Sequence, residues 1–332
     1  MTTASGDPRA PLILVNPRAS RLADATRRRD IVDAVSGAVQ RRFGRAPRVE
    51  AGSLDAGLAA LADAIEAPVV VVIGGDGSVR EAAALLVDRE TPLAVIPGGT
   101  GNVLAGAVGV RGIRPGIEAI RAGQVRAIDL GLVRWGPAAT ERSGARQTAA
   151  KPAAADRIDA DPGFDRVFIV ACGMGLDARI MAAAEHEWKR RIRFGAYVGA
   201  AFRELLHLES ARFRIVADGE RLEIEGYLAL VANAGELVPG RIGPRQPIDP
   251  ADGRLDLIVL GGSDPLSGLL SAAELLVRSG DLDGRVIRRS VREVSIETEP
   301  AQPGETDGDP HPAGRLEARV LPGGLTLLAP SR

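Results

Sequence analysis

The chain has 332 residues, enough for two domains, and 45% of them are hydrophobic, a proportion typical of a soluble protein. Its net charge of −1 and its 3% aromatic content argue against a nucleic-acid-binding surface, which needs clustered positive charge or stacking rings. The single cysteine, Cys172, excludes an intramolecular disulfide framework and indicates a reducing compartment. Because Cys172 lies in the apolar run VFIVACGMG, we predict a buried thiol rather than a nucleophile.

Several common signatures are absent from the sequence. No apolar run approaches the roughly 20 residues of a membrane-spanning helix, and residues 1–10 lack the apolar core of a signal peptide. A G-x-x-x-x-G-K-[ST] loop, a G-x-S-x-G elbow and a histidine zinc pattern are missing as well. We therefore expect any membrane contact to be peripheral, with no transmembrane segment and no nucleic-acid partner.

Residues 10–130 alternate strand and helix signals. Strands are expected at 11–16, 47–52, 68–75 and 93–98. Helices are expected at 20–43, after the second strand to about residue 65, at 79–87 and at 102–108. Ser20 is a candidate N-cap for the first helix. This β-α-β-α order predicts a doubly wound parallel sheet with helices on both faces, which would form a nucleotide-binding α/β domain.

The pattern changes over residues 131–322. Strands are expected at 125–135, 166–173, 211–217, 221–233, 254–260, 291–298 and 315–320, with helices at 176–208 and about 265–277. Consecutive strands separated by turn signals predict an antiparallel β-sandwich domain. Residues 136–163 are rich in Ala, Arg, Asp and Pro and predict a disordered insertion without catalytic function. The last apolar run, 323–330, is expected to return to the first domain.

Two glycine-rich turns follow the third and fourth predicted strands. The first is Gly74-Gly75-Asp76-Gly77-Ser78, and the second is Pro97-Gly98-Gly99-Thr100-Gly101-Asn102. Glycines let backbone N–H groups approach a ligand closely, and a helix N-terminus favours an anion there, so the pair predicts a cradle for nucleotide phosphates. Asp76 is placed to meet a magnesium ion held by those phosphates. The structural alternative is an ordinary strand-to-helix turn in which the aspartate caps the helix.

Three polar residues near these turns have candidate roles, and two of them, Asn102 and Glu81, have two interpretations each. Thr100 can donate a hydrogen bond to a phosphate oxygen, and Asn102 can brace the second loop or contact the nucleotide. Glu81 can orient the first loop through its amides, or it can simply complement the helix dipole.

The motifs GGDGSVRE (74–81) and PGGTGNVLA (97–105) resemble the catalytic domain of the diacylglycerol kinase family, which includes bacterial lipid kinases and sphingosine kinases. The similarity continues along the chain. Further matching segments are Asn16-Pro17 with Ser20, Ile128-Asp129-Leu130-Gly131, Gly173-Met174-Gly175-Leu176-Asp177-Ala178, Asn233, Asp252-Gly253-Arg254-Leu255-Asp256 and Asp307-Gly308-Asp309. The last tripeptide stands where the family carries D-G-E, so aspartate replaces the usual glutamate at 309.

The resemblance implies an ATP- and Mg²⁺-dependent lipid kinase whose active site lies in the cleft between the two domains. The implied acceptor is a diacylglycerol- or sphingoid-like lipid at a membrane surface, the implied location is the cytoplasm with peripheral membrane association, and a homodimer is left open. The implied cofactor-binding residues are Asn16, Gly74, Gly75, Gly77, Ser78, Glu81, Gly98, Gly99, Thr100 and Asn102. Asp307 and Asp309 are candidates for the base that receives the hydroxyl proton, with Asp76 as the third catalytic residue.

Other interpretations stay open at this point. ETDGDPHP and PIDPADG are good turn sequences, although the resemblance assigns a second magnesium site to Asp249 and Asp252. The basic stretch Trp188–Phe194 is either a membrane contact or a solvated helix face. A NAD kinase shares the G-G-D-G turn, and a non-catalytic lipid-binding protein could keep the same scaffold.

Overall fold

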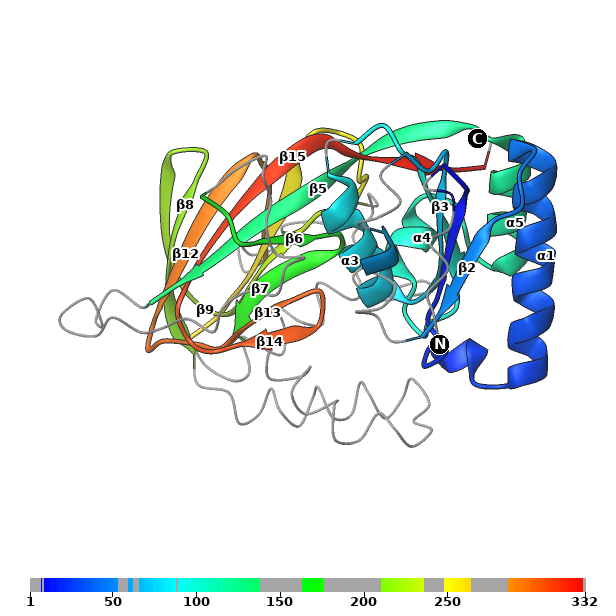
Figure 1. Ribbon diagram of the computed structural model, residues 1–332. Coiled ribbons are helices and arrows are strands. Elements are labelled where there is room, and N and C mark those ends of the chain that lie inside the picture. The colour runs from blue at the N-terminus through cyan, green and yellow to red at the C-terminus, as the bar shows by residue number, and fades with distance from the viewer. Residues whose placement is uncertain are drawn as a thin grey trace. The chain divides into compact units, whose positions relative to one another are not determined.

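The computed structural model describes residue 7 and residues 9–52, 59–61, 66–87, 89–137, 163–175, 210–235, 248–263 and 286–330 (Figure 1). The predicted helices at 176–208 and 265–277, most of the helix before residue 65, most of the 136–163 insertion and the stretch 188–194 lie outside these residues. The described chain forms two compact units: residues up to Leu130 together with 322–330, and the remainder from Gly131 to Leu321.

The first unit is built on four parallel strands. They lie in the order β2 (Arg48–Ala51), β1 (Leu12–Val15), β3 (Val70–Gly74) and β4 (Leu93–Pro97). Every residue of β1, β3 and β4 is buried, as expected for apolar strands that are covered on both faces. Leu327 also pairs in parallel with Leu93, which brings the C-terminal segment to this sheet.

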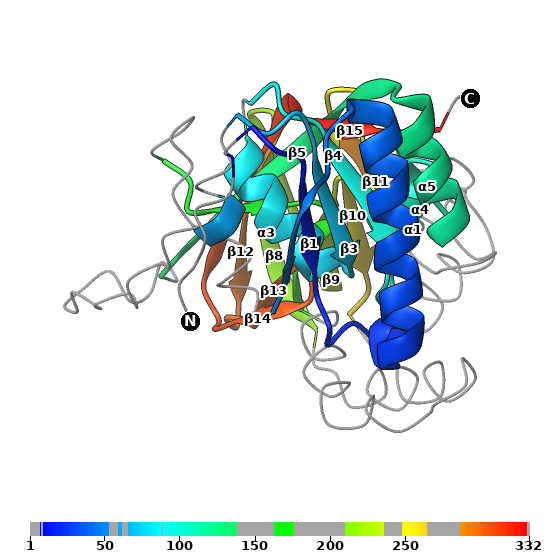
Figure 2. The same ribbon diagram turned by 45° about the vertical axis from the view of Figure 1, so that its right-hand side comes forward.

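Helices cover both faces of this sheet, which confirms the doubly wound class. The helices α1 (Ala25–Phe43) and α5 (Ile113–Ala122) lie on one face, and α3 (Asp76–Leu86) lies on the other (Figures 1 and 2). Ile31 and Val35 of α1 and Ile120 of α5 pack in one core with the strands. The short helix α4 (Val103–Ala107) follows β4.

The first helix begins later than predicted. Ser20–Leu22 form a short 3₁₀ turn, η1, and α1 starts at Ala25, so the expectation of a helix from 20 with Ser20 as its N-cap was wrong. Asp24 is the cap, since its carboxylate accepts a hydrogen bond from the Arg27 amide at 2.7 Å. The helix ends at Phe43 and is followed by Gly44, whose φ of 72° is the left-handed conformation that glycine tolerates.

The second unit consists of antiparallel strands, which confirms the β-sandwich class. Its strands are β6 (Arg166–Phe168), β7 (Ala171–Gly175), β8 (Ala211–Ala217), β9 (Glu220–Ala232), β10 (Leu255–Gly261), β11 (Val286–Val291), β12 (Glu293–Glu299), β13 (Gly304–Thr306) and β14 (Asp309–His311). β5 (Val125–Gly136) and β15 (Arg315–Leu328) contribute residues to both units. Strand β8 alternates buried and exposed residues along its length, so Ala211, Phe213, Ile215 and Ala217 face one core.

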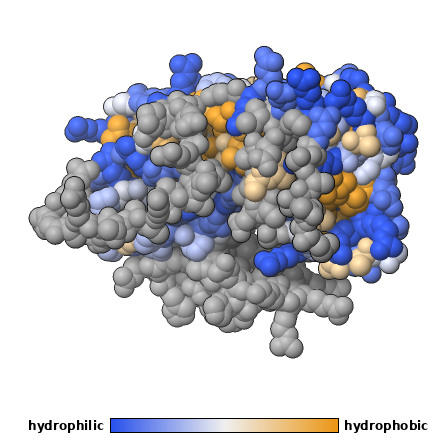
Figure 3. All heavy atoms as spheres, viewed as in Figure 1, coloured by the Kyte–Doolittle hydropathy of each residue, from blue (hydrophilic) through white to orange (hydrophobic). Residues whose placement is uncertain are grey.

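The region predicted as one strand at 166–173 is two strands, so that prediction was wrong. The chain bends at Ile169 and Val170, between β6 and β7. Hydrophilic residues make up much of the coloured surface in Figure 3, as expected when the strands turn their apolar residues inward. Among the described residues, no helix has the length and apolarity that crossing a membrane requires.

Replacing Gly131 by alanine is expected to destabilise the protein by about 3 kcal/mol or more, because overpacking a filled core forces side chains off their rotamers. A Cβ atom at Gly131 would lie 2.0 Å from Cζ of the fully buried Phe168. Gly136→Ala, in the same strand, is the control because no atom lies within 4 Å of its added Cβ. Denaturant unfolding measures both variants, and equal midpoints would contradict the packing argument.

Candidate functional site

The two glycine turns lie side by side at the carboxyl ends of adjacent parallel strands, β3 and β4. The Gly98 amide donates a hydrogen bond to the Gly74 carbonyl at 2.7 Å. A Cβ atom at Gly99 would lie 2.7 Å from Cα of Gly75, closer than real Cβ contacts allow. Only glycines therefore permit this approach, and the two turns form a cradle of backbone groups in the place where doubly wound sheets bind ligands.

The first turn opens helix α3, which starts at Asp76 and not at the predicted residue 79. The first amides of a helix have no partner within the helix, so they are available to an anion. Asn16, which follows β1, donates from Nδ2 to Ser78 Oγ at 2.8 Å. This bond ties the end of β1 to the first turn of α3.

The second turn is held by Asn102, which adopts a left-handed conformation with φ of 52°. Its Oδ1 accepts from the Gly99 amide at 2.9 Å, and its Nδ2 donates to the Gly99 carbonyl at 2.7 Å. Asn102 thus braces the loop, the first of its two interpretations. Thr100 stays exposed, with its hydroxyl 3.1 Å from that of Ser20.

Asp76 links the two turns. Its Oδ1 lies 3.4 Å from the Leu104 amide at the start of α4, and a Cβ atom at Gly101 would lie 2.9 Å from its Oδ2. Burial raises the pKa of the Asp76 carboxyl above its ordinary value, while the nearby backbone amides lower it in part. A divalent cation would favour the charged form, so a partly buried carboxylate beside the two glycine turns fits a magnesium ligand.

The Glu81 carboxylate pairs with Arg80, whereas the sequence analysis considered the loop amides as its partners. Its Oε1 lies 2.7 Å from Nη2 of Arg80, and both side chains are largely buried. The ion pair fixes Glu81 near the first turn of α3, and its predicted role in cofactor binding stays a prediction.

The other candidate carboxylates lie on the hairpin of β13 and β14 (Figure 1). Its two-residue turn, Asp307-Gly308, has φ of 48° and 88°, as tight hairpin turns require. The Asp307 carboxylate accepts hydrogen bonds from the amides of Ile169, Val170 and Ala171 at 2.8, 2.9 and 3.0 Å. Asp309 is exposed at the start of β14.

Trp135 anchors this hairpin, a role that the sequence analysis missed. Its Nε1 donates to Thr306 Oγ1 at 3.1 Å, and its ring stacks on His311 with centroids 4.7 Å apart. A Cβ atom at Gly304 would lie 1.9 Å from the indole ring. In the sequence, Trp135 is an isolated tryptophan near the end of a predicted strand. This position alone does not indicate which residues the indole ring contacts.

Glu305 and Cys172 complete the interior of the hairpin region. The buried Glu305 accepts from the Gly308 amide at 2.6 Å and closes the turn. Cys172 is buried, as predicted, and burial raises the pKa of its thiol, with the charges of Glu305 and Asp307 adding to the shift. A thiol kept protonated in this way is a poor nucleophile.

The predicted second magnesium site stays a prediction. Oδ1 of Asp252 accepts from the Arg254 amide at 2.9 Å, an arrangement typical of a turn. The described residues contain no group of three or more His, Cys, Asp or Glu side chains placed to hold a metal ion. The expectation of an active site in the cleft between the domains likewise stays a prediction.

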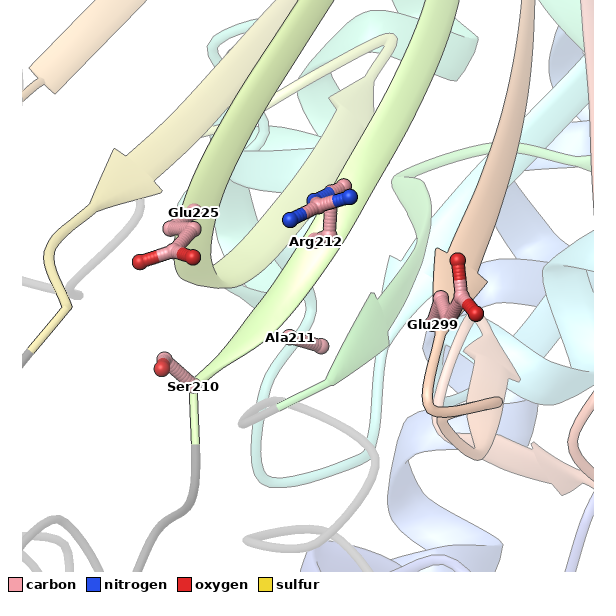
Figure 4. Close-up of a pocket in the computed structure, with 5 residues that line it drawn as sticks. All are labelled: Ser210, Ala211, Arg212, Glu225 and Glu299. Atoms are coloured by element: carbon pink, nitrogen blue, oxygen red, sulfur yellow. The ribbon is translucent and has the colours of Figure 1, made fainter.

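One hollow of the second unit has a polar lining that does not suit a lipid chain. Ser210, Ala211, Arg212, Glu225 and Glu299 surround a volume of about 230 Å³, with Arg212 and Glu225 on neighbouring strands (Figure 4). Lipid-binding pockets are lined mainly by apolar side chains, so we assign this hollow no role in substrate binding.

Comparison with known proteins identifies both halves of the chain. Residues 11–133 match the model of the diacylglycerol kinase catalytic domain, and residues 170–329 match that of the YegS C-terminal NAD kinase beta sandwich-like domain. Two solved structures, each described as a "putative diacylglycerol kinase" from Bacillus anthracis str. Sterne, have TM-scores of 0.70 and 0.69 at 20% and 22% identity, with 97% of each chain covered. At this identity the likeness establishes the fold alone.

Two curated relatives match parts of the sequence. An uncharacterized protein from Synechocystis sp. is 24% identical over 266 residues, which are 79% of this chain and 54% of the relative. A Staphylococcus epidermidis protein named "putative lipid kinase" is 25% identical over 138 residues, 40% of this chain and 43% of the relative. The chain thus spans about half the length of the curated relatives it matches.

Proposed function

Because the chain belongs to the diacylglycerol kinase catalytic-domain family, we propose that it transfers the γ-phosphoryl group of ATP to a lipid hydroxyl. The acceptor would be a diacylglycerol- or sphingoid-like lipid. The observation that carries this proposal is the close approach of Gly75 and Gly99, which makes one backbone cradle out of two turns. Phosphoryl transfer depends mainly on positioning and on neutralising phosphate charge, which is what such a cradle supplies.

In this proposal the cradle holds the nucleotide. The N-terminal amides of α3 would donate to phosphate oxygens, and Thr100 would add a hydroxyl donor. Residues assigned to nucleotide binding are Asn16, Gly74, Gly75, Gly77, Ser78, Gly98, Gly99, Thr100 and Asn102, with Asn16 and Asn102 acting through the loops that they brace. Asp76 would hold Mg²⁺, which when bound neutralises the charge that develops on the phosphates.

Asp309 is assigned as the base that receives the proton of the attacking hydroxyl. It is exposed at the edge of the hairpin, where a substrate can reach it. A base of this kind must lie within hydrogen-bond distance of the hydroxyl when substrate is bound. Aspartate is one methylene shorter than the family's glutamate, so the acceptor must approach the hairpin closely.

The cellular setting follows from the proposed acceptor. A diacylglycerol- or sphingoid-like lipid lies in a membrane, so the enzyme would work as a peripheral protein at the membrane surface. ATP and the free buried Cys172 favour the cytoplasm. The oligomeric state is left open in this proposal, as it was in the sequence analysis.

A second candidate has one observation in its favour. The model that matches residues 170–329 is described as NAD kinase beta sandwich-like, so a NAD kinase-like activity on a small-molecule hydroxyl is the alternative. A non-catalytic lipid-binding protein on the same scaffold is the third, although both glycine turns are intact here.

Phosphorylation assays with γ-labelled ATP separate these functions. The full chain is incubated with Mg²⁺ and, in parallel, with diacylglycerol, sphingoid bases, ceramide, polyprenols or NAD, and the products are resolved by thin-layer chromatography. We expect label in a lipid product. Label in NADP alone would favour the second candidate, and lipid binding without turnover of ATP would favour the third.

A further inference from the structure

The Asp307 carboxylate holds the bend between β6 and β7. It accepts one hydrogen bond from each of three consecutive amides, those of residues 169, 170 and 171. An ionised carboxylate has about four lone-pair positions, so these amides occupy most of its accepting capacity. Bonds from N–H groups to a charged acceptor are among the stronger ones in proteins, and this carboxylate is therefore committed to the bend.

The same bend is held from other sides. The Asp307 amide donates to the Ala171 carbonyl at 2.8 Å, so side chain and backbone of one residue bind the bend together. The fully buried Asn233 donates from Nδ2 to the Ile169 carbonyl at 3.1 Å and from its backbone amide to the Val170 carbonyl at 2.8 Å. The hairpin, the bend and the end of β9 are therefore one hydrogen-bonded assembly.

A second Asp-Gly turn in the same unit has a similar arrangement, with two amides bound in place of three. Asp218, between β8 and β9, also has φ of 48°, and its Oδ1 accepts from the amides of Arg292 and Glu293 at 2.8 and 3.0 Å. These amides lie where β11 passes into β12. Nothing in the proposed reaction involves Asp218, so its arrangement shows what such an aspartate does as a purely structural brace.

We propose that Asp307 is a positioning residue rather than a proton acceptor: it fixes the hairpin on the 169–171 bend and thereby places Asp309 for the acceptor hydroxyl. To act as a base, its carboxylate would have to leave the three amides, and it is costly to leave partly buried amides without partners. The proposal rests on the function proposed above for Asp309, while its structural half can be tested without any activity.

Hydrogen exchange measured by mass spectrometry tests the brace. We compare the full-length wild type with Asp307→Asn and with the matched control Asp218→Asn. Asparagine keeps the shape but replaces one accepting oxygen by a donor. Asp307→Asn is expected to speed exchange in peptides covering 166–175 by about tenfold or more, because both of its carboxylate oxygens accept hydrogen bonds there. Asp218→Asn keeps the single oxygen that accepts from the amides of Arg292 and Glu293, so it should leave exchange at 166–175 unchanged. Unchanged exchange at 166–175 would overturn the proposal.

Kinetics separate positioning from proton transfer. Asp309→Asn is expected to lower kcat by about 10²- to 10⁴-fold with little change in exchange, and Asp309→Glu to retain activity because it restores the residue usual in the family. Asp307→Asn should lower kcat less and leave the KM for ATP unchanged, and Asp307→Glu should not rescue it because the longer side chain displaces the bend.

The outcomes are distinguishable. Two results together would overturn the assignment of Asp309 as the base and Asp307 as the positioning residue. They are full activity in Asp309→Asn, and complete loss of activity in Asp307→Asn with unchanged exchange at 166–175. If Asp307→Asn does not fold, Asp307→Ser keeps one accepting oxygen and is expected to exchange at an intermediate rate. If the wild type phosphorylates no lipid, the proposed function fails, and the exchange comparison still decides whether Asp307 is a brace.

Discussion

Replacing Asp76 by asparagine is expected to abolish phosphoryl transfer while leaving the fold intact. The side chain is partly buried beside the start of α4 and belongs to the first turn of α3, so it links the two glycine turns. Asparagine has the same shape and keeps an oxygen for the Leu104 amide, but it lacks the charge that would hold Mg²⁺. We expect kcat to fall by about 10³-fold or more, the scale of a lost charge-stabilising group in phosphoryl transfer.

Transfer from γ-labelled ATP measures the loss, and thermal unfolding measures the fold. Because burial raises the pKa of Asp76 in the folded protein, the metal-free wild type loses stability as the pH rises through that pKa. The asparagine variant lacks this decline and is expected to be at least as stable at neutral pH. Asp24→Asn, at the exposed cap of α1, is the control and should keep full activity, since asparagine caps helices well. Normal activity in Asp76→Asn would contradict the assignment.

Replacing Gly99 by alanine is expected to weaken use of the nucleotide by about 100-fold in kcat/KM for ATP, since displacements of about 1 Å have effects of this size. The new Cβ would lie 2.7 Å from Cα of Gly75 and 3.2 Å from Oδ1 of Asn102. Neither the Gly75 backbone nor the Asn102 side chain can move away from the new Cβ without displacing its turn. The two loops must therefore separate, and the amides no longer converge on one triphosphate.

Gly106→Ala is the matched control for this variant. Gly106 lies in α4, seven residues further along, and no atom lies within 4 Å of its added Cβ. Calorimetric titration with Mg²⁺ and ATP compares the two variants with the wild type. We expect weak binding for Gly99→Ala and normal binding for Gly106→Ala; tight binding by both would show that contact between the turns is not required.

The N-terminal sheet could be predicted because its signals are local. Continuous, short apolar runs over 70–74 and 93–97 are typical of buried strands in a sheet covered on both faces, and each run is followed by a glycine. The start of α1 was misplaced because Ser20 and Asp24 are both good caps, and sequence alone does not say which carries the cap. The break at Ile169 was missed because Asp307, which binds it, lies 138 residues away.

The candidate site was predicted in its residues more completely than in its roles. The glycine spacing predicts a phosphate cradle, and the structure brings the two glycine turns side by side. The direction of a side chain is set by tertiary contacts, so the sequence could not decide that Asn102 braces its own loop or that Asp307 faces three amides. Trp135 was missed for the same reason, as its contacts with Thr306 and His311 join residues far apart in the chain.

A crystal structure with Mg²⁺ and a non-hydrolysable ATP analogue tests the phosphate cradle most directly. We predict that the triphosphate lies within hydrogen-bond distance of the amides that open α3 and of the Thr100 hydroxyl, with the cation on Asp76. A nucleotide bound elsewhere in the protein, with both glycine turns empty, would contradict the proposed function.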